Sequence, residues 1–164
     1  MNKVGLLLDQ LHRAETRLGA EFRRVAGREA ADQEVYYVCR DLARQCDERA
    51  AAIRRLGARY GRSIAAPSGP GSLRTALTEL RRRASYLLGR QRISGLLLLR
   101  DLRALFLAAQ AANVAWIAVG QLAQALKDGE MLTLVNGLHT ENLTQIKWIK
   151  SKVREASPQA LLSR

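Results

Sequence analysis

Proline is scarce in this sequence. Two of the three prolines fall in the segment GRSIAAPSGPG at 61–71, and such clusters of proline and glycine mark loops. Neither side of this loop shows a strand pattern or an internal repeat at a fixed period. These absences argue against sheet-containing and repeat architectures, so we expect an all-α fold.

Cysteine is equally rare, with Cys39 and Cys46 the two in the chain. They are seven residues apart in what we predict to be one helix, which separates them by about 10.5 Å along its axis. A disulfide needs Cα atoms within about 7 Å, so these two cysteines cannot pair with each other. We expect both to be reduced thiols in the core.

Acidic residues are outnumbered by basic ones, 15 to 27, which gives a net charge of +12. This charge favours anionic partners and says nothing about fold. Aromatic residues do not interleave with the arginines as a base-stacking platform requires, so nucleic-acid binding would be weak and nonspecific. The alternative is an ordinary solvated face. The candidate anion-binding residues are Arg54, Arg55, Arg81, Arg82 and Arg83.

Charge is absent altogether from residues 104–126. The length of this run would allow a membrane span. Its many alanines make it less apolar than a typical span, and four amides lie within about 80° of one another on one side of the helix. We therefore predict a buried bundle helix in which the amides form a solvated seam or subunit contact, or line the bundle interior. The amides are Gln110, Asn113, Gln121 and Gln124.

The first fifteen residues, MNKVGLLLDQLHRAE, do not follow the order of a signal peptide, because Asp9 interrupts a short apolar run. We expect a cytoplasmic protein without a transmembrane segment.

Apolar residues recur at intervals of three and four along four long segments, as in bundle helices. The first segment ends near Gly27, the second follows an acidic turn at Asp32 and Glu34, the third spans about 96–127, and the fourth spans about 130–155 and ends before Pro158. The predicted inward positions are Val4, Leu8, Leu11, Glu15, Leu18, Phe22 and Val25; Val35, Val38, Leu42, Cys46, Ile53, Leu56 and Tyr60; and, in the last, Leu134, Leu138, Ile146, Ile149 and Val153.

Short links within each half of the chain predict two antiparallel hairpins in one domain, 1–164. The hairpins cover about 2–60 and 96–156, and the connection at 61–95 is long enough to cross the bundle and to hold a short helix beginning near Ser72. One crossover between two hairpins is the ferritin-like topology.

Three strings carry a family resemblance: LHRAETRL at 11–18, AAQAANVAWIA at 108–118 and LHTENLTQI at 138–146. They resemble metal-ligand segments of the bacterial ferritin-like proteins of the YciE/YciF type, which are small bundles with a helical crossover and a carboxylate-rich metal site. The resemblance places Glu15 and Glu141 at ligand positions. It also implies that two further carboxylates would fall at Asn113 and Trp116.

The metal ligands of that family are mostly missing. A di-iron centre takes about four Glu and two His, with Glu-x-x-His from two helices. No Glu-x-x-His occurs here, and the indole N–H of Trp116 cannot ligate. We expect no cofactor and a degenerate site, its interior lined or filled by Gln110, Asn113 and Trp116. The alternative is bound iron or manganese, or a single metal held by remnant ligands, namely Glu15, Glu141, His139 and His12.

Glu15 lies in the apolar seam of its helix, where a charge must be paired or neutralised. We expect an ion pair or hydrogen bond from a neighbouring helix, with Arg49 or Asn113 as the partner.

No phosphate loop, nucleophile elbow or Cys-x-x-Cys occurs, so no enzyme class is indicated and no catalytic residue is assigned. The sequence favours a non-enzymatic structural or binding protein of unknown ligand. A ferritin-like oxidoreductase or stress protein and a nonspecific polyanion binder are the alternatives. The Ala-rich third helix and Trp148 predict a symmetric homodimer.

Overall fold

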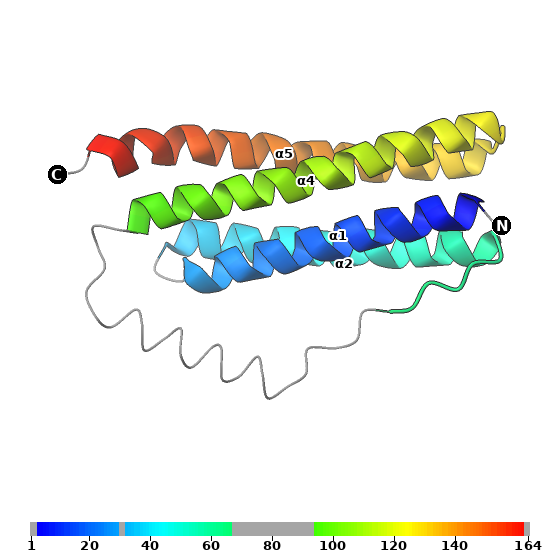
Figure 1. Cartoon of the computed structure of the whole chain (residues 1–164), viewed down its shortest axis with the longest axis horizontal. Coiled ribbons are helices and arrows are strands. Elements are labelled where there is room, and N and C mark those ends of the chain that lie inside the picture. Colours follow the sequence, from blue (N-terminus) through cyan, green and yellow to red (C-terminus); the bar gives the residue numbers. More distant parts are fainter. Residues whose placement is uncertain (1–2, 30–31, 67–93, 163–164) are drawn as a thin grey trace.

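Four helices make up the computed structural model, which describes residues 3–29, 32–66 and 94–162 (Figure 1). They are α1 (Lys3–Arg28), α2 (Gln33–Arg59), α4 (Ser94–Ala125) and α5 (Gly129–Leu162). These ranges contain no strand, so the predicted all-α class is confirmed. The short helix expected from near Ser72 lies outside the described residues, as does most of the segment 61–95.

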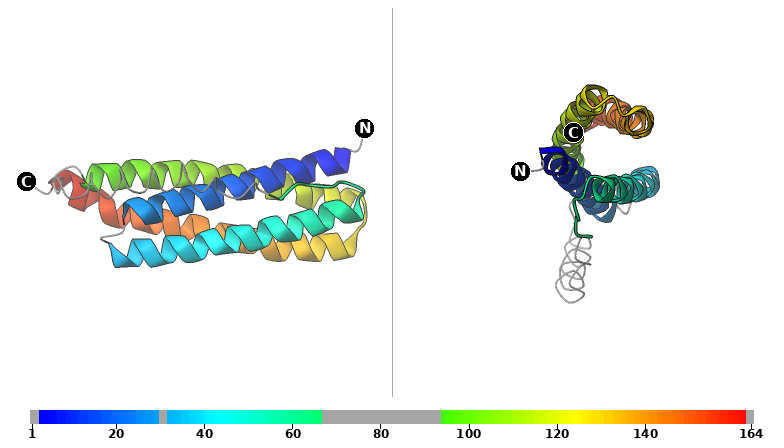
Figure 2. Two further views of the ribbon diagram at one scale, coloured as in Figure 1. Left: turned by 90° about the horizontal axis from the view of Figure 1, so that it is seen from below. Right: turned by 90° about the vertical axis from the view of Figure 1, so that its right-hand side faces the viewer.

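The helices form two antiparallel pairs. α1 packs along α2, α4 packs along α5, and the pairs meet mainly through α1 and α4. Seen end-on, the helices follow an arc in the order α2, α1, α4, α5, and α2 and α5 have the least contact of the neighbouring pairs (Figure 2). α2 and α4 run in the same direction, so the end of α2 and the start of α4 lie at opposite ends of the bundle (Figure 1).

The seams predicted for α1 and α2 are largely confirmed. Asp32 caps α2 by accepting a hydrogen bond from the backbone N–H of Val35 at 3.1 Å. Gly19 lets the two helices approach closely, since a Cβ there would lie 3.1 Å from the Cβ of Cys46. The buried seam residues are Leu8, Leu11, Glu15, Leu18, Phe22 and Val25 on α1 and Val35, Leu42, Cys46, Ile53 and Leu56 on α2; Val4, Val38 and Tyr60 are half-buried.

α4 contains the uncharged run and has two different faces. By length and composition Gly95–Ala125 could cross a membrane, yet here it packs in the bundle, with one third of its most apolar window buried. The other side of the helix is exposed, so the helix is only partly buried. The inward residues are Leu102, Leu105, Ala109, Ala112, Trp116, Val119 and Ala123.

The amide stripe of α4 does not line the interior. Gln121 and Gln124 are exposed, and Gln110 and Asn113 are half-buried. The apolar seam of α4 turns toward the bundle, so Gln110, Gln121 and Gln124 lie away from it, while Asn113 still reaches Nε2 of His139 on α5 at 2.7 Å. Gln110 and Asn113, predicted as interior residues, are thus only half-buried, whereas Trp116, 1% exposed, is in the core.

The inner face of α5 also differs from the prediction. Leu134 was expected inward but is 38% exposed, while Asn142, Gln145 and Lys152 are buried. Ile146 and Ile149 are buried as predicted, and Leu138 and Val153 are half-buried. The prediction failed because it took polar residues to be outside, whereas polar groups of α2 hold Gln145 and Lys152 inside.

α5 also continues through Pro158 to Leu162, beyond the predicted end near Glu155. Proline removes one backbone donor from a helix. The last turns nevertheless pack against the start of α4, where a Cβ on Gly95 would lie 2.9 Å from the Cβ of Ala160. This packing favours a continuous helix.

A buried carboxylate joins the two helix pairs. Asp101 of α4 is 1% exposed, and Arg28 of α1 donates two hydrogen bonds to it, at 2.7 and 2.9 Å. Arg24 of α1 adds a longer one at 3.4 Å. Glu29 follows α1 at this junction. Burial raises its pKa from 4.5 to about 7, with the charges of Asp101 and Asp32 adding to the rise and Arg28 opposing it.

Glu29 gives stability a pH dependence. Since its pKa is raised in the folded protein, ionising it costs stability, and the free energy of unfolding falls as the pH rises from about 4.5 to about 7. Glu29→Gln should therefore stabilise the protein by about 1–2 kcal/mol near pH 8, a value reduced for solvent screening, and have almost no effect near pH 5. Urea unfolding at both pH values measures this, with the exposed Glu130→Gln as control. Equal effects at both pH values would contradict it.

Candidate functional site

Polar side chains from all four helices meet inside the bundle. They are Glu15 of α1, Arg49 of α2, Trp116 of α4 and Gln145 of α5, and none is more than 1% exposed. Each occupies an inward position of its helix, and Glu15, Arg49 and Trp116 have apolar residues three or four positions away on both sides. We call these four residues the polar centre.

Both carboxylate oxygens of Glu15 are engaged. Nη2 of Arg49 donates to Oε2 at 2.9 Å, and the indole Nε1 of Trp116 donates to Oε1 at 2.6 Å. Of the two partners expected for Glu15, Arg49 is the correct one, and Asn113 instead bonds Gln110 and His139. The buried charge of Glu15 is thus neutralised by a buried cation.

Arg49 links three helices. Its Nη2 also donates to Oε1 of Gln145 at 2.8 Å and lies 3.3 Å from Sγ of Cys46, and its Nη1 donates to Glu141 at 3.4 Å. Burial alone lowers the pKa of Arg49. The charge of Glu15 and the hydrogen bond to it outweigh that effect, so the pKa of Arg49 lies above its ordinary value. The guanidinium therefore stays charged in the core.

Gln145 joins α5 to α2, the pair of neighbouring helices with the least contact. Its Nε2 donates to the backbone carbonyl of Leu42 at 3.2 Å, while its Oε1 accepts from Arg49. Further along, Nζ of Lys152 binds Glu34 of α2 at 2.9 Å. Polar contacts thus hold α2 and α5 together.

Some buried polar atoms of the polar centre, and of Asn142 one turn before Gln145 on α5, have no partner. Both side-chain polar atoms of Asn142, and Nε of Arg49, have no hydrogen-bond partner in the described part of the chain. An unpaired buried polar group costs about 1–3 kcal/mol. The carboxylate of Glu15 therefore has its hydrogen-bond donors, whereas the buried amide of Asn142 has no partner among the described residues.

Cys39 and Cys46 are both buried and free, as predicted. Burial raises the pKa of each thiol to about 12; nearby carboxylates, Glu29 and Asp32 for Cys39 and Glu15 for Cys46, add to the rise. Thiolates, the reactive form, are therefore scarce at neutral pH. Neither cysteine has the environment of a nucleophile.

The four remnant metal ligands do not come together. Glu141 is exposed and contacts Arg49, and Nε2 of His139 lies 2.7 Å from Oδ1 of Asn113. No group of three or more His, Cys, Asp or Glu among the described residues could hold a metal ion. A guanidinium at 2.9 Å from Glu15 also places a positive charge where a metal would have to bind. The donor set does not fit a metal centre.

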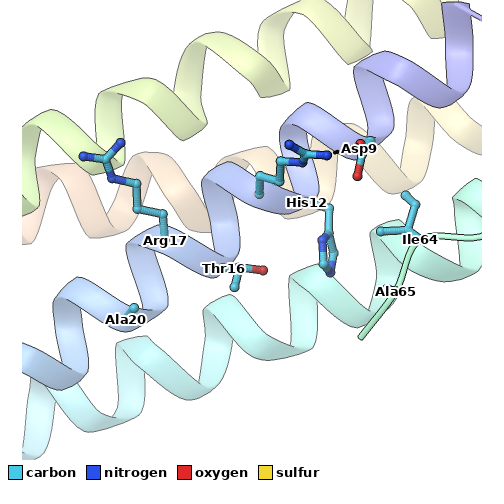
Figure 3. Close-up of a pocket in the computed structure, with 8 residues that line it drawn as sticks. Asp9, His12, Thr16, Arg17, Ala20, Ile64 and Ala65 are labelled. Carbon is cyan, nitrogen blue, oxygen red and sulfur yellow. Dashed lines mark hydrogen bonds and ion pairs between the residues drawn. The ribbon is translucent and has the colours of Figure 1, made fainter. Parts of the chain in front are cut away.

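His12 lies on another part of α1, beside a surface hollow of about 430 Å³ (Figure 3). Burial, and then the charge of Arg54, lower its pKa, so the imidazole is neutral at physiological pH. Asp9 on the same wall is already paired with Arg13 at 2.9 Å. The lining residues are Asp9, His12, Arg13, Thr16, Arg17, Ala20, Ile64 and Ala65.

The predicted anion-binding arginines are only partly described. Arg54 is half-buried and Arg55 is exposed on α2, and neither forms an ion pair with a described acid. Arg81, Arg82 and Arg83 lie outside the described residues.

Sequence patterns missed two buried polar residues of α5, Gln145 and Asn142. Asn142 lies four residues after Leu138 and Gln145 lies four residues before Ile149, and this spacing was the available signal. Comparison with known proteins adds nothing to this site, since no family model, curated protein or solved structure matches the chain.

Proposed function

We propose that this protein is a non-enzymatic, ferritin-like helical bundle that serves as a structural or binding protein, and that its Arg49 supplies the positive charge that a metal supplies in metal-binding bundles. The observation that carries this proposal is the pairing of Glu15, whose two oxygens are taken by Arg49 and Trp116. A carboxylate engaged in this way is already paired with a cation, so a metal ion would have to displace Arg49 to bind it.

The arrangement of the helices supports the ferritin-like topology. The helices form two antiparallel pairs, and α2 and α4 run in the same direction, which is the arrangement that one long connection between hairpins produces. Two reduced, buried cysteines agree with a cytoplasmic protein. The metal-dependent oxidoreductase remains the alternative that an experiment must separate from this proposal.

Metal content separates the two functions. We expect the protein, purified after growth in medium supplemented with iron, manganese and zinc, to contain none of them in stoichiometric amount, because Arg49 repels a cation from Glu15. Elemental analysis of the purified chain measures this, and Arg49→Glu, which removes the repelling charge, is the comparison variant. Near two irons per wild-type chain would refute the proposal and support the oxidoreductase.

A further inference from the structure

α4 has a second seam on the side that faces away from the bundle. Positions 107, 110, 114, 117 and 121 are spaced by three and four residues, so they lie along one side of the helix. Three of them are aliphatic and largely exposed: Leu107 at 58%, Val114 at 63% and Ile117 at 49%. The other two are Gln110 and Gln121. We call these five residues the outer face of α4.

The spacing of the outer face is that of a helix-packing seam. A strict three-and-four repeat of aliphatic residues with an occasional amide is the pattern by which one helix packs against another, and buried amides in such a seam fix the register. The inner seam of α4, with Ala109, Ala112 and Trp116, already packs within the bundle. The outer face therefore has the pattern of a contact without a partner helix in the described chain.

The distribution of charge favours a second copy of this chain as the partner of the outer face. The protein carries a net charge of +12, yet residues 104–126, which include the outer face, have none. Two copies of this chain repel each other least at such a surface, and a strongly charged partner would find no counter-charge there. Glutamine is both donor and acceptor, so identical amide-bearing faces can satisfy each other. In hydrocarbon the same amides would be costly, which disfavours a lipid partner.

We propose that the outer face of α4 is the contact surface for a second copy of this chain in a symmetric dimer. The contact does not depend on whether the polar centre binds a metal. Trp148, which the sequence suggested as a second contact, is half-buried near Phe22, with ring centroids 6.5 Å apart, and is not part of this surface.

The small area of the outer face limits how tightly two copies can bind. The outer face runs from position 107 to position 121 and is therefore about 21 Å long, and a helix with its side chains is about 10 Å wide. This strip is smaller than the roughly 800 Å² per partner of a standard interface. We therefore expect a reversible dimer with a dissociation constant in the micromolar range.

A charge at the centre of the outer face tests the proposal. Val114→Arg should weaken dimerisation by at least about 100-fold, since like charges would meet across the twofold axis. Sedimentation velocity over a concentration series measures this. Tyr37→Arg adds the same charge at a matched exposure of 65% on α2 and should leave the dimer unchanged. Circular dichroism checks that both variants remain folded.

Mixing identifies the partner as this chain. Val114→Arg and Val114→Glu should each be monomeric alone and should associate when combined, because opposite charges then face each other. A monomeric wild type throughout the micromolar range, or a Val114→Arg protein that dimerises as well as wild type, would overturn the proposal. Binding of monomeric wild type to phosphatidylcholine vesicles, lost in Val114→Arg, would assign the face to lipid instead and overturn it equally.

Discussion

Replacing Arg49 with alanine is expected to lower the free energy of unfolding by about 3–5 kcal/mol, one of the two largest effects of a single substitution in this protein. Arg49 is fully buried and pairs with the fully buried Glu15 at 2.9 Å. Without it, Glu15 remains a buried charge with no cation, and Gln145 loses its donor. Urea unfolding followed by circular dichroism measures the loss.

A double-mutant cycle isolates the contribution of this pair. Glu15→Ala alone strands the Arg49 charge, whereas Glu15→Ala with Arg49→Ala removes both charges. We expect the double variant to lose less stability than the sum of the single losses, with a coupling of about 2–3 kcal/mol. Arg44→Ala on the same helix, which breaks an exposed ion pair with Asp41, is the control and should have a much smaller effect. Additive losses at Glu15 and Arg49 would show that the pair is not coupled.

Trp116→Ala should cost about 3–5 kcal/mol for a different reason. The side chain is the largest of those fully buried, so its removal leaves a cavity, and it also removes the donor to Oε1 of Glu15. Trp116→Phe separates the two causes, because it keeps most of the apolar contact and loses the N–H. Trp148→Phe is the matched control for the half-buried tryptophan.

We expect Trp116→Phe to lose about 1–3 kcal/mol, the cost of leaving one buried oxygen without its donor. Thermal and urea unfolding of the three variants would establish the order. A Trp116→Phe protein as stable as wild type would mean that the hydrogen bond to Glu15 contributes nothing.

The sequence predicted those parts of the fold that depend on apolar spacing. The seams of α1 and α2 follow from residues such as Leu8, Leu18 and Leu56, which bury apolar surface at intervals of three and four. Glu15 interrupts such a seam, which predicts a partner on a neighbouring helix, and the structure identifies that partner as Arg49. The prediction of a partner for Glu15 rests on the rule that a charge in an apolar seam needs a counter-charge.

The inner face of α5 could not be predicted in the same way. Asn142, Gln145 and Lys152 are inside although their side chains are polar. Gln145 and Lys152 are held there by Arg49 and Glu34 on another helix, and no local pattern reveals such partners. Likewise, the continuation of α5 past Pro158 depends on packing against Gly95, which is more than sixty residues away in the chain.

A metal titration followed by the fluorescence of Trp116 tests most directly the claim that Arg49 takes the place of a metal. In a Trp148→Phe background, Trp116 is the single emitting tryptophan, and its indole bonds the carboxylate that a metal would need. We predict that its emission stays unchanged as Fe²⁺ or Mn²⁺ is added without oxygen, because Glu15 remains bound to Arg49. Saturable quenching of Trp116 at one or two metal ions per chain would contradict the account.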